Sequence, residues 1–172
     1  IKDLQVDVTS LPAKILIPFL KNISFNPFDK SVKENLLNWD YKLEPNSISA
    51  AVYVAWEKAI IDQAGKNFIP KSVRPYIESL QLKRIIDWIL DPKKKFKDAT
   101  KRDLFLKKTF ELAIADLKTR IGDNTSNWQY GQPKNKHSQI SHALGKVVEK
   151  KIGEKLNLGP LPRGGNGYTV GS

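Results

Sequence analysis

Two histidines are the first residues of this chain that could do chemistry. His137 and His142 lie five positions apart, and no acidic residue lies between them. That spacing does not put both rings on one face of a helix, whereas a zinc-binding helix pairs histidines four positions apart and needs a third ligand. We therefore expect each histidine to tether a loop through hydrogen bonds, with metal binding as the alternative interpretation.

Nucleophilic catalysis has no recognisable motif in the sequence. There is no cysteine, which excludes Cys–His catalysis, disulfides and thiolate metal sites. Serine, histidine and carboxylate residues are all present, but the Gly-x-Ser-x-Gly turn of many serine hydrolases is not. Residues 163–167 (Arg-Gly-Gly-Asn-Gly) resemble a phosphate-binding loop only superficially, because no Lys-Ser/Thr pair or helix follows. Their glycines instead predict close backbone approach or positive φ before a strand.

The elements that would position these residues are mostly helices. Residues 4–8 alternate apolar and polar side chains, which predicts a short strand. Thr9 or Ser10 could then cap a helix that carries Pro12 in its first turn, where a missing N–H costs nothing. Pro18 lies farther in and should kink or end that helix.

Two further helices are predicted before residue 60. Ser31 and Glu34 have the spacing of a capping box, which predicts a helix start. Residues 44–47 form a break that ends in a serine suited to cap the next helix. Residues 50–56 are apolar on nearly all sides, which is typical of a helix buried in a larger body.

The middle of the chain predicts two amphipathic helices. One begins at Ser72 and ends at Asp91-Pro92. The other spans about residues 100–121, with apolar side chains at spacings of three and four, and Gly122 suits the left-handed position past a helix end.

The chain changes character after Gly122. Residues 1–122 form a predicted helical region, and residues 123–172 a loop-rich segment of the same structural unit. Residues 137–155 could hold a short helix, and residues 168–170 read as a terminal β-strand. The predicted fold class is therefore mostly α (α+β), with short strands near the two ends.

The composition is that of a folded protein with an uneven charge. Of 172 residues, 40% are hydrophobic and 27% charged, so wholesale disorder is not expected. No apolar run approaches the roughly 20 residues needed to span a bilayer, so no membrane partner is expected. The net charge is +11, and residues 61–172 carry the whole excess. The cluster Lys93 to Lys97 predicts either a basic connector exposed to solvent or a surface for nucleic acid or anionic membrane.

Four segments carry a more specific signal because they occur in a fixed order. Residues 4–14 run from Leu-Gln through an aspartate and a serine into a helix with a proline. Residues 37–56 contain Leu-Asn-Trp-Asp-Tyr, then Ser-Ala-Ala and a helix with Trp56. Residues 128–142 contain Trp-Gln-Tyr-Gly and both histidines, and residues 160–170 contain Pro-Leu-Pro-Arg-Gly-Gly-Asn-Gly-Tyr-Thr-Val.

Together these segments resemble the penicillin acylase (penicillin amidase) family of N-terminal nucleophile hydrolases over about residues 1–170. The chain departs from the family pattern at Asn166, where many members have aspartate, and at Tyr130, where many have tryptophan. The resemblance implies the helical region of an N-terminal nucleophile (Ntn) hydrolase β chain, which returns to the central sheet through the strand at residues 168–170. It also implies that the tryptophans are core anchors rather than a substrate box: Trp39, Trp56, Trp88 and Trp128.

The resemblance places the reaction outside this chain. In the family a serine at the N-terminus of the β chain attacks the amide carbonyl, and its own α-amine acts as the base. That serine, an asparagine, a supporting arginine and the ligands of a structural calcium all precede the segment matched here. Ile1 is not a nucleophile, and the chain contains no methionine. We therefore assign no catalytic, cofactor-binding or metal-binding residue, and expect an internal piece of a longer protein that is inactive alone.

The implied parent is a periplasmic or secreted bacterial amidohydrolase that acts on linear amide C–N bonds. Its substrates would be penicillins, acyl-homoserine lactones or related small N-acyl compounds, and the partners of this chain would be the remainder of the α and β chains, not nucleic acid. If so, apolar surface should be exposed where the missing sheet docks.

Two other hypotheses stay open at the sequence level. A helical, basic interaction module would bind nucleic acid or an acidic partner. It should gather one set of cations on a continuous face: Lys83, Arg84, Lys94, Lys101, Arg102 and Lys108. A complete small enzyme would instead use His137 or His142 for catalysis.

Overall fold

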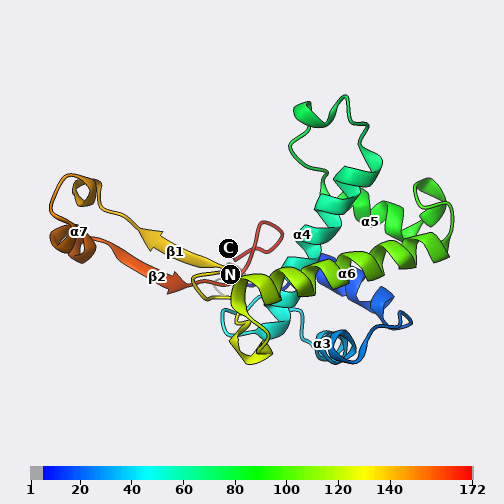
Figure 1. Cartoon of the computed structure of the whole chain (residues 1–172), viewed down its shortest axis with the longest axis horizontal. Helices are drawn as coiled ribbons and strands as arrows, with labels where there is room; N and C mark the ends of the chain where they lie inside the picture. The colour runs from blue at the N-terminus through cyan, green and yellow to red at the C-terminus, as the bar shows by residue number, and fades with distance from the viewer. Residues whose placement is uncertain (1–5, 172) are drawn as a thin grey trace.

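The computed structural model describes residues 6–171, and within them the chain is mostly helical, as predicted. The α-helices and strands are α2 (Leu11–Leu16), α3 (Pro27–Leu37), α4 (Ile48–Phe68), α5 (Leu82–Leu90), α6 (Ala99–Ile121), β1 (His137–Ile140), α7 (Lys150–Leu156) and β2 (Leu158–Pro162). In Figure 1, α2 to α6 form a helical body, and β1, α7 and β2 form an arm that projects from it. No helix among residues 6–171 is long and apolar enough to cross a membrane.

The core of the helical body is built on the packing of α4 against α6. The Trp56 ring meets the Phe110 ring edge-on, with 5.7 Å between centroids. The Trp56 indole N–H donates to the Thr109 hydroxyl at 3.1 Å, so this buried polar atom is satisfied. Residues 50–56 are buried almost all round, which confirms the prediction of an enclosed helix.

The four tryptophans belong to this core. Trp56 and Trp128 are fully buried, and Trp39 and Trp88 are partly buried against the same cluster. A buried aromatic ring of this kind removes roughly 150–250 Å² from water, so these side chains contribute a large share of the apolar burial.

Helix starts follow local capping chemistry, and the start predicted at Ser31 is wrong. Ser10 caps α2 as predicted, by accepting the N–H of Ala13. The helix predicted to begin at Ser31 begins at Pro27, because Asn26 accepts the N–H of Asp29 and the proline occupies the first turn. Ser31 therefore lies inside α3.

The ends of α2 and the start of α4 agree with the sequence. The α2 helix ends at Leu16 and tightens into a 3₁₀ turn (Ile17–Leu20) that contains Pro18. Ser47 caps α4 by accepting the N–H of Ala50, as the predicted break requires.

The start of α5 differs from the prediction, whereas its end agrees. The helix begins at Leu82 instead of Ser72 and ends just before Asp91. Ile77 accounts for the break, because its backbone is extended (φ −120°, ψ 106°) and the chain does not continue as a helix there. The chain forms a short 3₁₀ turn (Arg74–Tyr76) before it instead.

The longest helix, α6, is close to its prediction. Asp98 caps it by accepting the N–H of Lys101, and it continues to Ile121. Gly122 follows with φ +114° and ψ 175°, so it uses the positive φ open to glycine but not the left-handed helical geometry.

The strands lie elsewhere than expected. In the arm, β1 and β2 pair antiparallel, with His137 opposite Pro162 and Ile140 opposite Leu158, so the segment after Gly122 holds a two-stranded sheet as well as α7. The strand predicted at residues 168–170 is wrong, because Asn166 turns the chain: its side-chain oxygen accepts the N–H of Tyr168 at 2.9 Å.

The strand predicted at residues 4–8 lies partly outside the described residues. The part that is described forms no regular strand, but the chain beside it is extended. Thr9 makes an isolated antiparallel bridge to Lys42, and the Leu43 N–H donates to the Val8 carbonyl at 2.9 Å.

Candidate functional site

The four motif-bearing segments meet around the loop of residues 41–47. The first segment reaches this loop through the carbonyl of Val8, which accepts the Leu43 N–H. The fourth reaches it through Gly165, whose N–H donates to the Leu43 carbonyl at 2.9 Å. The third reaches it through Gly131, whose N–H donates to the Pro45 carbonyl at 2.5 Å. Segments more than 100 residues apart in sequence therefore share one backbone junction.

Close backbone packing explains the glycines of this junction. A Cβ on Gly164 would lie 2.5 Å from the Leu43 carbonyl oxygen, and one on Gly131 would lie 2.5 Å from the Pro45 Cβ. Gly165 has φ +68°, a conformation that side chains with a Cβ rarely adopt. The glycine-rich run thus permits both the close approach and the positive φ that the sequence predicted.

A buried carboxylate, that of Glu57, lies beside the junction on the third turn of α4. Glu57 is only 5% exposed, and both of its oxygens are occupied. The Tyr53 hydroxyl donates to Oε2 at 2.6 Å, and the Asn166 amide donates to Oε1 at 3.0 Å. With Tyr130 and Tyr168, these residues form what we call the Glu57 cluster.

Burial governs the electrostatics of the Glu57 cluster. It raises the pKa of Glu57 from 4.5 to about 7, and the hydrogen bond from Tyr53 opposes this only partly. Burial, followed by the charge of Glu57, also raises the pKa of Tyr130 to about 12 and raises the pKa of Tyr53 and of the half-exposed Tyr168. The cluster can therefore hold or release one proton near neutral pH, at Glu57.

Tyr130 connects this cluster to the junction. Its hydroxyl donates to the Gly165 carbonyl at 2.7 Å, and its backbone N–H donates to the Ser47 carbonyl at 3.2 Å. One residue of the third segment thereby contacts both the second and the fourth.

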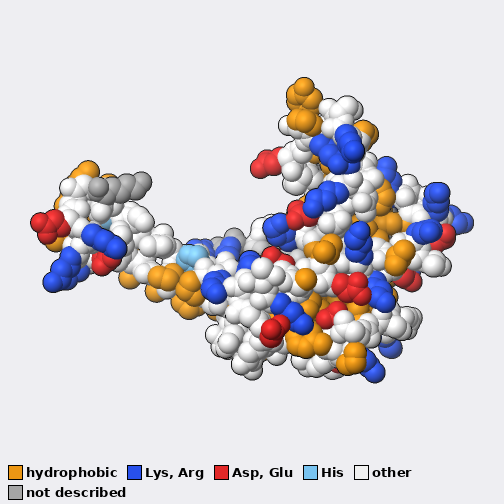
Figure 2. Space-filling model, viewed as in Figure 1, with side chains coloured by type: hydrophobic (Ala, Val, Ile, Leu, Met, Phe, Trp, Pro, Cys, Tyr) orange, Lys and Arg blue, Asp and Glu red, His pale blue; other side chains and the backbone are white. Residues whose placement is uncertain are grey.

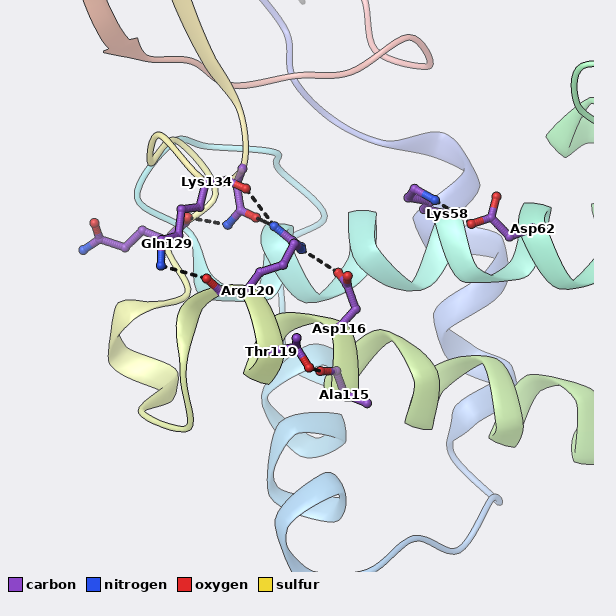
Figure 3. Close-up of polar contacts among 9 residues, drawn as sticks. Lys58, Asp62, Ala115, Asp116, Thr119, Arg120, Gln129 and Lys134 are labelled. Carbon is purple, nitrogen blue, oxygen red and sulfur yellow. Dashed lines mark hydrogen bonds and ion pairs between the residues drawn. The ribbon is translucent and has the colours of Figure 1, made fainter.

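An arginine at the end of α6 holds the third segment in place (Figure 3). Arg120 pairs with Asp116 at 2.8 Å on its own helix, and its guanidinium donates to the Lys134 carbonyl at 2.7 Å. It also donates to the Asn135 side chain at 2.8 Å, and Asn135 in turn donates to the Gln129 carbonyl. Both ends of the turn that contains the Tyr-Gly pair are thus fastened to α6.

The two histidines lie on the arm rather than in the Glu57 cluster. His137 begins β1 and His142 follows it, and both are exposed. His142 accepts the Leu144 N–H at 3.1 Å through Nδ1, a local tether of the kind expected. Among residues 6–171 there is no group of three His, Cys, Asp or Glu side chains that could hold a metal ion.

Several cations that a basic module would use are paired with acids. Lys83 pairs with Asp87 at 3.3 Å, and Arg102 pairs with Asp103 at 2.8 Å. The Arg102 guanidinium also lies over the Phe19 ring at 4.7 Å. On the face shown in Figure 2, basic side chains are interspersed with acidic and apolar ones.

Sequence reasoning missed Glu57, Tyr53 and Tyr168 as members of one site. The available signal was a glutamate directly after the apolar run of residues 50–56, because a charge on a wholly buried helix needs partners. The partner Asn166 lies 109 positions away, and no local pattern connects the two.

Comparison with known proteins gives one family. The family model described as penicillin amidase matches residues 1–172, the whole chain. A search of curated proteins finds none that matches.

Proposed function

Because the chain belongs to the penicillin amidase family, we propose that it is an internal part of the β chain of an amide hydrolase that cleaves small N-acyl compounds. The observation that carries the proposal is the family match over all 172 residues. The meeting of all four motif-bearing segments at one backbone junction supports it, since it gives the motifs a common structural purpose.

In this proposal the nucleophile lies outside residues 1–172. A serine at the N-terminus of the mature β chain attacks the amide carbonyl, and its α-amine, with a pKa near 8, takes the proton. Neighbouring amide groups stabilise the oxyanion. The chain described here contributes scaffold: the Glu57 cluster and the junction fix the loop of residues 41–47 against α4.

The arm supports the idea that more protein packs here. Ile140, Leu158 and Leu161 are 62%, 54% and 44% exposed, and Val147 near the tip is 76% exposed. A two-stranded sheet with apolar side chains open to water is marginal by itself. We propose that the sheet of the parent enzyme covers these side chains, in a periplasmic or secreted bacterial protein.

The decisive experiment compares the chain with a longer polypeptide. The 172-residue chain and the complete precursor that contains it are each assayed with a chromogenic N-acyl anilide. We expect no turnover by the chain and measurable turnover by the processed precursor, lost when the serine at its new N-terminus is replaced by alanine. Hydrolysis by the chain alone that disappears in His137→Ala or His142→Ala would refute the proposal and establish a self-contained enzyme.

A further inference from the structure

A second site lies at the opposite end of α4 from the junction. A cavity of about 380 Å³ opens between the last residue of α4 and the first half of α6. Its floor is aromatic: the Phe68 and Phe96 ring centroids are 5.2 Å apart, and those of Phe96 and Phe105 are 5.1 Å apart. Leu104, 60% exposed, forms an apolar wall. We call this cavity the Phe68 pocket.

Four lysines surround the Phe68 pocket: Lys95, Lys97, Lys101 and Lys108. All four are exposed, and within residues 6–171 none of them has an acidic side chain within ion-pair distance. The Lys95 ammonium lies 5.7 Å from the Phe68 ring centroid, so one cation already faces the aromatic floor. The pocket therefore combines an apolar floor with a rim of uncompensated positive charge.

A second cavity of the same volume shows that this combination is not general. It lies between α4 and α6 near residues 134–136 and is also lined by cations. There Lys58 pairs with Asp62, Arg120 pairs with Asp116, and the Lys134 ammonium donates to the Arg120 carbonyl. Three of the four cations of that cavity are therefore held by the protein itself, Lys136 being the fourth. In the Phe68 pocket Lys95 faces the Phe68 and Trp88 rings, whereas Lys97, Lys101 and Lys108 are available to a ligand.

The backbone of the rim is shaped to produce this arrangement. Lys97 has φ +74°, a left-handed conformation that is unfavourable for a residue with a Cβ. The turn it makes lets Phe96, only 5% exposed, enter the floor while Lys97 itself stays on the rim. Strain of this kind is common where a ligand is held.

We propose that the Phe68 pocket binds a small organic anion with a flat apolar body, such as an aryl carboxylate. The aromatic floor contacts the rings of the ligand, and the lysines contact its carboxylate. Duplex nucleic acid, whose bases are stacked inside the helix, would satisfy the lysines but leave the aromatic floor uncovered, so it fits the pocket less well.

The probe for this site is 2-naphthoate, titrated into the whole chain and followed by ¹H–¹⁵N NMR and calorimetry. We expect shifts confined to residues 67–68, 95–97 and 101–108. The neutral analogue 2-naphthalenemethanol should bind at least tenfold more weakly, and inorganic phosphate should not displace the naphthoate. Higher ionic strength should weaken binding, because exposed charges are screened.

Variants that remove lysine charges distinguish specific binding at the Phe68 pocket from a general effect of the net charge of the chain. The double variant Lys101→Gln with Lys108→Gln should weaken binding about tenfold, as expected for two exposed charges near a carboxylate. The control Lys30→Gln with Lys155→Gln removes the same charge from exposed positions elsewhere and should leave affinity unchanged. Leu104→Asp, at another exposed position, should abolish binding by placing a carboxylate in the wall.

Three outcomes would overturn the proposal. The control pair could weaken binding as much as the pocket pair, which would mean that only net charge matters. The neutral alcohol could bind as tightly as the acid. A single-stranded oligonucleotide could bind at these residues while 2-naphthoate does not, which would make the surface a polyanion site instead.

Discussion

Replacing Glu57 with glutamine should stabilise the chain at alkaline pH and leave it unchanged in acid. In the folded chain burial raises the pKa of Glu57 from 4.5 to about 7. Between these two pH values the folded chain holds a proton that the unfolded chain has released. The free energy of unfolding therefore falls as pH rises through this window, and the loss is complete above about pH 7. At about 1.4 kcal/mol per pKa unit, it amounts to about 3 kcal/mol.

Glutamine is a close structural substitute for the protonated acid. Its side-chain oxygen can accept the Asn166 amide, and its nitrogen can donate to the Tyr53 hydroxyl, so both contacts of Glu57 have a counterpart. The variant stays neutral at every pH and so avoids the cost of a buried charge. We expect the free energy of unfolding of Glu57→Gln to exceed that of the wild type by about 3 kcal/mol at pH 8 and to match it within about 1 kcal/mol at pH 5.

The assay is urea unfolding followed by tryptophan fluorescence at pH 5, 6, 7 and 8. Every other titrating group is common to both proteins, so the difference between their curves isolates position 57. Glu78→Gln, at an exposed position, is the matched control and should change stability by less than about 0.5 kcal/mol at each pH. A variant with no advantage at pH 8, or an advantage that is the same at pH 5 and pH 8, would refute the reasoning.

Three further predictions use the same unfolding assay. Gly165→Ala should lower the free energy of unfolding by at least about 2 kcal/mol, because φ is +68° and a Cβ would collide with backbone. Gly167→Ala, with open space around its Cβ, should lower it by less than about 0.5 kcal/mol, and equal losses in the two variants would contradict this. Trp39→Phe should lower the free energy of unfolding by less than about 1 kcal/mol, because the buried Nε1–H of Trp39 has no acceptor within residues 6–171. Trp56→Phe should lower it by about 2–3 kcal/mol, because the buried Thr109 hydroxyl would lose its donor, and the reverse order of the two losses would contradict this. Lys97→Gly should raise the free energy of unfolding by about 0.5–1 kcal/mol by relieving a left-handed φ, and a loss of stability would show that the conformation is not strained.

Helices were predictable from this sequence where the signal was local. Ser10 and Ser47 cap helices by hydrogen bonds to residues three positions away, and the α6 stripe repeats within single turns, so each was visible in a short window. The errors at Ser31 and Ser72 also came from local patterns. Asn26 and Pro27 begin α3 earlier than Ser31, and after Ser72 the chain makes a 3₁₀ turn and an extended stretch before α5 begins.

Strands and the candidate site were not predictable in the same way. β1 pairs with β2 across an intervening helix, and both strands are exposed, so neither shows the apolar alternation that marks a strand packed on a core. The apolar-polar pattern at residues 168–170 is instead used in a turn, because the Thr169 hydroxyl accepts the Asn166 N–H and the Thr169 N–H donates to the Asn166 carbonyl. The Glu57 cluster depends on contacts between residues 109 positions apart, which a single sequence does not reveal.

The contact between Glu57 and Asn166 also gives a physical reason for one departure from the family pattern. An aspartate at position 166 would place a second carboxylate about 3.0 Å from Glu57 Oε1, where the asparagine amide now donates. Two carboxylates so close and so buried cannot both ionise, so they would share a proton or separate. Separation would release the glycine-rich run from α4 and weaken the junction at Leu43. In this chain the amide donor at 166 therefore suits the glutamate at 57 in both of its protonation states, because it needs no shared proton.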